Sequence, residues 1–260
     1  MRIAVIGAGV AGLGAGLALA RDGHDVVILE RDATPLPQDP HAAFEWDRRG
    51  APQVRHSHAL LARLRNLLRD HYPDVLDDLL AAGATELRFT ENLPPTIEDR
   101  SPHPGDEDLV ALACRRTTFE WVLRRSVLAQ GGVELRDGVV IDALDGANGV
   151  VTGVRLADGD RAGGGPASSV PADVVVAANG RRSPISGWLA DVGAAPVFEE
   201  EEDTGIVYFS RFYRLCGGEE PVMEGPIGAD LGYLKFAVFR GDNGTFSVTL
   251  AVANDDTELR

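Results

Sequence analysis

A glycine-rich turn near the start of the chain is the segment whose residue types and spacing best suit binding chemistry. Gly7, Gly9 and Gly12 form a Gly-x-Gly-x-x-Gly pattern after one apolar segment, and Glu30 ends the next. In such a turn the first glycine permits a tight reversal, the second lets the backbone approach a pyrophosphate, and the third lets a helix pack closely. A carboxylate after the second strand accepts hydrogen bonds from a ribose diol and repels a 2′-phosphate. The pattern therefore predicts a dinucleotide site.

Three elements are expected to position these residues: strand Arg2–Ile6, helix Val10–Arg21 and strand Asp25–Leu29. Together they predict a mononucleotide-binding βαβ unit, with phosphate at the helix N-terminus, where unpaired amides and the helix dipole stabilise negative charge. The basic second residue and the apolar stretch after it also fit a secretory signal peptide. The second strand and Glu30 follow at the distance that the βαβ unit needs, which favours the dinucleotide interpretation.

The composition predicts a cytoplasmic enzyme domain. The 260 residues are 44% hydrophobic, without an apolar run of membrane-spanning length, so we expect no stable membrane insertion. The net charge of −15 argues against nucleic acid and anionic membrane surfaces as partners. Cys114 and Cys216 are too few and too far apart for a disulfide framework or a metal site, and we expect both as reduced thiols in or near the core.

The middle of the chain alternates between helix and strand patterns. Residues 32–55 are rich in Pro, Asp and Arg without a hydrophobic period, which predicts a long functional loop. Ser57 is expected to cap a helix over 58–70, and a helix over 75–82 is expected to end at Gly83. The elements expected next are a loop and strand region over 84–105, strand 109–113, helix 118–130, strand 133–136, strands 139–144 and 150–156, a glycine-rich turn at 163–165 and strand 173–177. This alternation indicates that the first sheet resumes after an insertion.

The pattern becomes purely β beyond Pro196. A long strand is expected over 205–215, and strands over 233–240 and 245–253 flank residues 241–244, which are expected to form a hairpin turn. These strands predict the beginning of a second domain built on a sheet.

Four segments together carry a family resemblance. They are the glycine turn with Glu30-Arg31, the segment Arg48–His58, the segment Arg116–Glu120, and the segment Val174–Ser183 with Trp188-Leu189. In this combination the chain resembles the group A FAD-dependent monooxygenases, flavoprotein oxidoreductases of the p-hydroxybenzoate hydroxylase fold. The resemblance runs through nearly all of the chain.

The resemblance implies an α/β fold: a discontinuous, Rossmann-like FAD-binding domain of the glutathione reductase type with part of a β-sheet substrate domain. The expected FAD-binding domain comprises residues 1–83 and 106–195, and the partial substrate-binding domain comprises 84–105 and 196–260. A third family segment, a Gly-Asp pair whose aspartate reaches the FAD ribityl chain before a helix, is not found, because Gly241-Asp242 lies in the expected hairpin turn. The chain therefore looks like the C-terminally truncated front part of a longer enzyme.

The resemblance also implies FAD as the tightly held ligand, with Glu30 on the adenosine ribose and Arg31 on the adenine side. Arg48 would approach FAD from the long loop and Arg116 from the start of its helix; a surface salt bridge is the alternative for each. The expected cofactor-binding residues are Gly7, Gly9, Val10, Ala11, Gly12, Glu30, Arg31, Arg48, Arg116, Asn179 and Gly180.

Two positions depart from the family pattern. Group A enzymes usually have Asp and Arg where this chain has Asn179 and Ser186, in a segment that serves both FAD and the nicotinamide cofactor. NADPH or NADH is the expected reductant. Gln53, His56 and His58 are candidates for lining a cavity, with helix capping or packing as the alternative; the sequence offers no cluster that would make the histidines metal ligands.

The function that the resemblance implies is oxygen transfer to a small organic substrate, by hydroxylation or epoxidation, through a C4a-hydroperoxyflavin formed with O₂. The sequence identifies no catalytic residue. Side chains of the later strands could line the cavity, with alternate ones facing away: Tyr208, Ser210, Arg211 and Tyr213. Alternatives are a flavin-dependent reductase of isoprenoid chains, a flavin halogenase, which the presence of a single lysine at Lys235 disfavours, and a non-catalytic FAD-binding fragment.

Overall fold

The computed structural model describes residues 1–93, 97–157, 168–216 and 227–259. These divide into two compact units, each of which is described by itself. The first unit comprises Met1–Gln38, Glu45–Pro52 and Leu123–Glu201; the second comprises Asp39–Phe44, Gln53–Val122 and Glu202–Arg260. The expected turn at 163–165 lies outside the described residues. The assignment of chain stretches to an FAD-binding and a substrate-binding domain stays a prediction.

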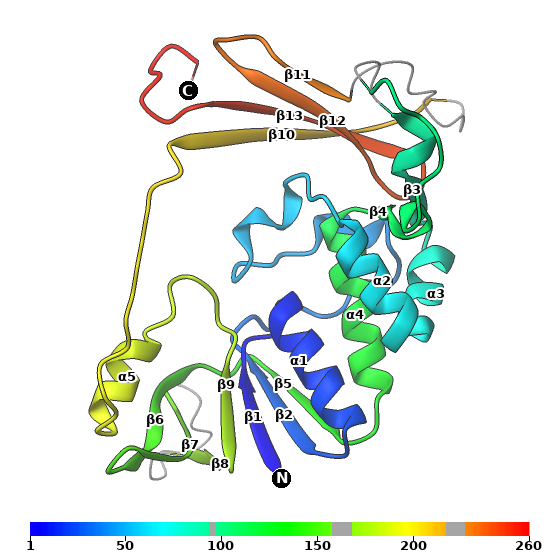
Figure 1. Ribbon diagram of the computed structural model, residues 1–260. Coiled ribbons are helices and arrows are strands. Elements are labelled where there is room, and N and C mark those ends of the chain that lie inside the picture. Colours follow the sequence, from blue (N-terminus) through cyan, green and yellow to red (C-terminus); the bar gives the residue numbers. More distant parts are fainter. Residues whose placement is uncertain (94–96, 158–167, 217–226, 260) are drawn as a thin grey trace. The chain divides into compact units, whose positions relative to one another are not determined.

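The first unit is built on a parallel sheet of four strands, in the order β5-β2-β1-β9 (Figure 1). Strands β1 (Arg2–Ile6) and β2 (Asp25–Glu30) are joined by helix α1 (Val10–Arg21), as expected. Strands β5 (Val133–Asp137) and β9 (Val174–Ala177) come much later in the chain and flank this pair. The sheet therefore does resume after an insertion, and the expected α/β, Rossmann-like arrangement is confirmed.

Each face of this sheet is covered by a different layer (Figure 1). Because side chains alternate along a strand, Ile28 faces α1, where it lies under Gly16, while Leu29 faces the other way. On that second side the parallel sheet packs in one apolar cluster with a smaller antiparallel sheet and helix α5. These elements are β6 (Ile141–Ala147), β7 (Val150–Leu156), β8 (Ser169–Pro171) and α5 (Ile185–Asp191).

The second unit contains an antiparallel sheet in the order β10-β13-β12-β11, together with a small β3-β4 pair. Its strands are β10 (Ile206–Arg214), β11 (Gly228–Asp230), β12 (Lys235–Arg240), β13 (Thr245–Ala253), β3 (Thr85–Arg88) and β4 (Val110–Ala113). Its helices are α2 (Ala62–His71), α3 (Pro73–Ala81) and the first half of α4 (Arg116–Ala129), with short 3-10 turns at Phe89–Asn92 and Asp106–Asp108. The expected hairpin is confirmed, since β12 and β13 pair antiparallel around residues 241–244.

Two expectations about local structure, the start of a helix at residue 58 and the burial of Cys216, were wrong. Helix α2 begins at Ala62 and not at residue 58, because the Ser57 hydroxyl, expected to cap it, bonds Ser247 and Thr249 instead. The long loop contains two 3-10 turns, Ala42–Glu45 and Pro52–Arg55. Cys216 is exposed, whereas Cys114 is buried as expected. The end of α3 near Gly83, at a φ of +97°, is confirmed.

A buried ion pair fastens the β12–β13 turn to the segment between β4 and α4. Asp242 accepts hydrogen bonds from the backbone amide of Arg115 at 2.8 Å and from its Nη2 at 2.6 Å. Neither side chain is more than 4% exposed. Burial alone would raise the pKa of the Asp242 carboxyl, but the hydrogen bonds and charge of Arg115 outweigh it and hold that pKa below its ordinary value of 3.8.

Replacing Asp242 should therefore destabilise the second unit. The substitution Asp242→Asn removes the charge that compensates a buried guanidinium, which costs about 3 kcal/mol in the free energy of unfolding. Urea unfolding at neutral pH measures this loss. The matched control is Asp230→Asn in the same sheet, where the ion pair with Lys235 is exposed, and its stability should stay near that of the unaltered protein.

The same pair predicts an acid dependence. Because the folded pKa of Asp242 is lowered, its contribution is present above the unfolded pKa and is lost as the pH falls through the folded pKa. The difference in stability between the unaltered protein and Asp242→Asn should thus shrink below pH 3.8. A difference that stays constant down to the acid limit of folding would contradict this assignment.

Candidate functional site

The glycine turn after β1 is held in place by close backbone contacts. Gly7 has a φ of +98°, and a Cβ atom there would lie 2.8 Å from the carbonyl oxygen of Ala178, at the end of β9. A Cβ at Gly12 would lie 1.8 Å from the carbonyl oxygen of Gly7. Both positions therefore require glycine for the packing of the turn against the sheet and against α1.

Gly9 differs from its two neighbours in the motif. Its φ is −76°, and a Cβ atom there would have nothing within 4 Å. It stands directly before α1, whose N-terminus no side chain caps. The chain's own packing gives no reason for glycine at this position, so the open space suits a ligand that approaches the backbone and the helix dipole.

Glu30 connects the end of β2 to the glycine turn. Its carboxylate is buried, and Oε2 accepts the amide of Ala8 at 2.7 Å while Oε1 accepts the amide of Asp32 at 3.0 Å. A carboxylate oxygen has two lone pairs, so each oxygen retains acceptor capacity beside these bonds. Glu30 thus both fixes the turn and can accept hydrogen bonds from hydroxyl groups.

Arg48 reaches the same turn from the long loop. Its Nη2 donates to the carbonyl oxygen of Ala8 at 2.8 Å and lies 3.7 Å from Glu30 Oε2. The guanidinium stacks on the buried ring of Trp46, with 4.8 Å between Cζ and the ring centroid. Arg48 is therefore buried against the turn, and its ion pair with Glu30 is not a surface salt bridge.

Asn179 and Gly180 lie on the opposite side of the turn. The Cα atom of Asn179 would be 3.1 Å from a Cβ at Gly7, and its buried Oδ1 atom has no hydrogen-bond partner among the described residues. Gly180 has a φ of +85° and open space where a Cβ would stand. An unpaired buried acceptor beside an open glycine is the arrangement that a hydroxyl-bearing ligand would satisfy.

The structure thus gathers most of the expected cofactor-binding residues around one turn of the first unit. Val10 and Ala11 begin α1, and Arg31 is exposed next to Glu30. Arg116 belongs to the second unit, where its Nε donates to the buried Glu120 at 2.8 Å. Its contact with a cofactor stays a prediction.

Sequence reasoning missed two residues of this site, Trp46 and Arg124. Both are buried, and Arg124 Cζ lies 5.6 Å from the Trp46 ring centroid. For Trp46 the sequence offered one signal, an aromatic residue two positions before Arg48 in a loop expected to be functional. For Arg124 it offered none, because Arg124 comes 76 residues after Arg48.

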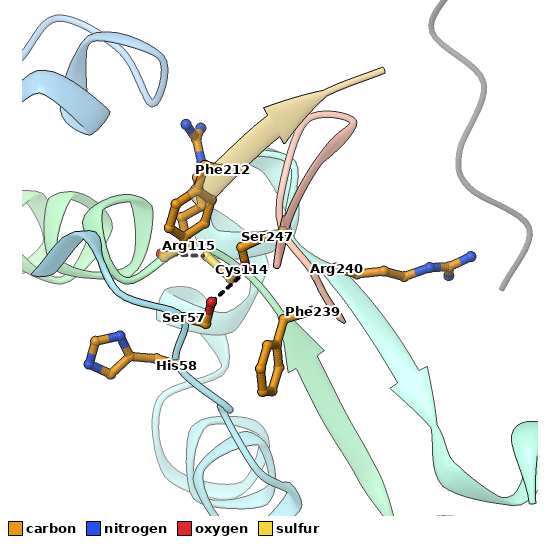
Figure 2. A pocket seen from close by; sticks show the side chains of 9 residues that line it. Ser57, His58, Cys114, Arg115, Phe212, Phe239, Arg240 and Ser247 are labelled. Atoms are coloured by element: carbon orange, nitrogen blue, oxygen red, sulfur yellow. Dashed lines mark hydrogen bonds between the residues drawn. The ribbon is translucent and has the colours of Figure 1, made fainter. Parts of the chain in front are cut away.

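The second unit contains a small pocket of about 10 Å³, room for about one water molecule. Figure 2 shows Ser57 and Ser247 facing each other there, with Phe212 and Phe239 nearby. The Ser57 hydroxyl lies 2.6 Å from the hydroxyls of both Ser247 and Thr249. The pocket is too small for an organic substrate, so it provides no substrate site as it stands.

A row of hydroxyl groups extends from this pocket to His56. Thr249 Oγ1 lies 2.7 Å from Ser210 Oγ, which lies 3.2 Å from His56 Nδ1. Of the four candidate cavity residues on β10, Ser210 takes part in this row, whereas Arg211 and Tyr213 stack on each other and are exposed. No catalytic role follows from these contacts.

The two histidines of the segment 53–58 differ in their surroundings, and Gln53 is exposed. His58 lines the pocket and donates from Nδ1 to the carbonyl oxygen of His56 at 2.9 Å. Burial lowers the pKa of His58 below its ordinary value, and the nearby charge of Arg116 acts in the same direction, so the imidazole is neutral at pH 7. In the described part of the chain, no group of three or more His, Cys, Asp or Glu residues could hold a metal ion.

Comparisons with known proteins identify the fold. Residues 5–36 match the family described as NAD(P)-binding Rossmann-like domain. The structure resembles PqsL of Pseudomonas aeruginosa, a probable FAD-dependent monooxygenase, with a TM-score of 0.66 and 15% identity over 100% of this chain and 62% of that chain. It also resembles p-nitrophenol 4-monooxygenase PnpA of Pseudomonas putida DLL-E4, with a TM-score of 0.65 and 16% identity over 99% of this chain and 59% of that one. The chain therefore has the fold of the FAD-dependent monooxygenases.

A curated relative is protein Rv3254 of Mycobacterium tuberculosis, which is 32% identical over 226 residues, or 82% of this chain and 45% of the relative. The chain thus spans less than half the length of that relative. The fold is shared with enzymes of another activity, since the myxobacterial chondrochloren halogenase CndH, an FAD-dependent halogenase, matches with a TM-score of 0.66 and 19% identity over 99% of this chain and 54% of that one. Among the described helices, none has the length and apolar character needed to cross a membrane.

The contrast between Gly9 and Gly12 can be tested by a matched pair of substitutions. Gly12→Ala should destabilise the first unit by more than about 2 kcal/mol, because its methyl group would overlap a backbone oxygen. Gly9→Ala should leave the free energy of unfolding within about 0.5 kcal/mol of the unaltered protein and yet abolish dinucleotide binding. Denaturant unfolding and ligand titration measure the two effects. Unimpaired binding by Gly9→Ala would rule out this turn as the phosphate site.

Proposed function

We propose that the protein binds FAD at the glycine turn of the first unit and is a flavin-dependent oxidoreductase, specifically a monooxygenase of small organic substrates. The observation that carries the proposal is the open space at Gly9, flanked by the buried Glu30 carboxylate and the unpaired Asn179 Oδ1. These features fit a dinucleotide with a pyrophosphate and a ribose diol. The fold, which FAD-dependent monooxygenases share, supports FAD over NAD as that dinucleotide.

Each residue of the site would have a distinct part in holding the cofactor. The backbone of Gly9, Val10 and Ala11 would receive the pyrophosphate at the N-terminus of α1. Glu30 would accept hydrogen bonds from the adenosine ribose, and Asn179 from a further hydroxyl group. Gly180, which leaves its surroundings open, would allow close approach of the cofactor.

The arginines of the site would supply positive charge. Arg48 would partly neutralise the pyrophosphate from its place at Ala8. Arg31 would approach the adenine side, and Arg116 would contact the cofactor from the start of its helix. Bound FAD would supply electron transfer from a nicotinamide reductant and the activation of O₂. The protein would orient the substrate and exclude water, so no catalytic triad is needed.

The reactants and the location belong to the same proposal. A small organic substrate, O₂ and NADPH or NADH as reductant fit the fold and the family resemblance, and one structure of PqsL is a complex with 2-aminobenzoylacetate. The acidic, mixed composition supports a place in the cytoplasm.

A halogenase is the second candidate, since the fold is also that of CndH. The chain has one lysine, Lys235, which lies exposed on β12 and pairs with Asp230 at 3.2 Å. A halogenase that depends on a lysine in a closed active site is therefore disfavoured. An isoprenoid reductase would also hold FAD and would reduce its substrate without consuming O₂.

The first test is the flavin content of the purified protein. We expect one FAD per chain, measured by absorbance after release with acid and identified by chromatography. The variant Gly9→Ala, which should fold normally, is the control for adventitious flavin. Absence of FAD from the purified protein, together with no binding on addition of FAD, would overturn the proposal.

The second test addresses the reductant and the reaction. Under anaerobic conditions NADPH or NADH should bleach the bound flavin, and admission of air should restore its absorbance. If FAD binds but neither nucleotide bleaches it, the chain is an FAD-binding module and not an externally reduced monooxygenase.

A further inference from the structure

Trp46 lies between two buried arginine side chains in the first unit. The Cζ atom of Arg48 is 4.8 Å from its ring centroid and that of Arg124 is 5.6 Å away. The Trp46 residue is only 3% exposed. Arg124, from the second half of α4, forms an ion pair with Asp137 at the end of β5. The stack therefore joins the long loop to the parallel sheet.

In this stack Arg48 forms an ion pair with Glu30 but no hydrogen bond to it. Its Nη2 donates to the Ala8 carbonyl oxygen at 2.8 Å but stays 3.7 Å from Glu30 Oε2, beyond hydrogen-bond distance. In a buried site a guanidinium this near a carboxylate gains most from a bidentate pair, with two parallel N–H···O bonds. Such a pair would occupy the lone pairs of Glu30 that a ribose diol needs.

The indole ring favours the orientation of Arg48 in which this bidentate pair is not formed. Cation–π attraction favours Arg48 on the face of Trp46, and the attraction is strengthened where water is excluded. The ring itself is held in place because Arg124 contacts it and is anchored by Asp137. A rotation of Arg48 toward Glu30 would have to give up the contact with the ring and the bond to Ala8.

We propose that Trp46, held by Arg124, is a positioning residue that keeps Arg48 in a 3.7 Å ion pair with Glu30, without hydrogen bonds between the two side chains, and so reserves the Glu30 lone pairs for the ribose of the dinucleotide. This inference rests on the proposed binding of FAD. It adds a determinant of ribose recognition that lies in neither the glycine turn nor the second strand.

The test compares the dissociation constants of FAD and of its analogue that lacks the adenosine 2′-hydroxyl. The unaltered protein should prefer FAD by about tenfold or more, the factor expected from one hydrogen bond to a charged group. In Trp46→Leu the released Arg48 forms hydrogen bonds to Glu30, so FAD binding weakens and the preference falls toward one. Trp46→Phe, which retains an aromatic face, should keep most of the preference.

A second substitution separates positioning from mere support of the fold. Adding Arg48→Gln to Trp46→Leu removes the charge that captures Glu30, so the preference for the 2′-hydroxyl should return even though two side chains of the stack are altered. The matched control is Trp188→Leu, in the apolar cluster of the same unit, which should lower stability and leave the preference unchanged. If Trp46→Leu does not fold, Arg124→Gln, which frees the ring, carries the same comparison.

The outcomes distinguish this inference from the proposed function. Failure of the unaltered protein to bind FAD would overturn both. Tight FAD binding without preference for the 2′-hydroxyl would overturn the role of Glu30 and with it the inference. A preference that survives in Trp46→Leu, or that Arg48→Gln fails to restore, would overturn the inference alone.

Discussion

The hydrogen bond from the Ala8 amide to Glu30, at 2.7 Å, is the interaction on which the geometry of the first unit's site depends. A buried carboxylate is tolerated only where donors surround it. Here the donors are backbone amides, so the charge of Glu30 fixes the path of the chain through the glycine turn and after β2. The positive φ of Gly7 is a consequence of that path.

The placement of Ala8 by Glu30 also positions the long loop at the site. The carbonyl group of Ala8 points to Arg48, whose guanidinium stacks on Trp46. Gly50 donates its amide to Asp32 at 2.9 Å, so the loop is also tied to the residues that follow β2. A segment without hydrophobic periodicity is thereby ordered through charge and hydrogen bonding, which explains why its sequence is rich in Arg and Asp.

Local patterns predicted those parts of the structure that depend on neighbouring residues. The strand Arg2–Ile6, the helix Val10–Arg21 and the strand Thr245–Ala253 were expected with the bounds that they have. Contacts between distant residues could not be predicted in this way. Serine is a residue type that often caps helices, yet the Ser57 hydroxyl bonds Ser247 and Thr249, which are 190 and 192 residues away in the sequence. Trp46 and Arg124 meet only because the sheet brings α4 and the loop together.

Two buried carboxylates of the chain show how a structural acid differs from one available to a ligand. Both oxygens of Asp242 accept donors from Arg115, and Oδ1 also accepts the Asn243 side chain at 2.9 Å. Such a carboxylate is saturated, which is why the Gly241-Asp242 pair stabilises a hairpin and has no acceptor capacity left for a cofactor.

Glu30 is also buried but accepts one amide at each oxygen, and its ion pair with Arg48, at 3.7 Å, is longer than a hydrogen bond. The difference lies in what competes for each nearby arginine. Arg115 also has a ring neighbour, Phe44 at 5.5 Å, but its Nε and Nη2 both donate to Asp242. Trp46 holds Arg48 at 4.8 Å and leaves Glu30 with unused lone pairs. Incomplete saturation of a buried charge is costly to a folded chain, and its presence beside an open glycine is the physical argument for a ligand at this turn.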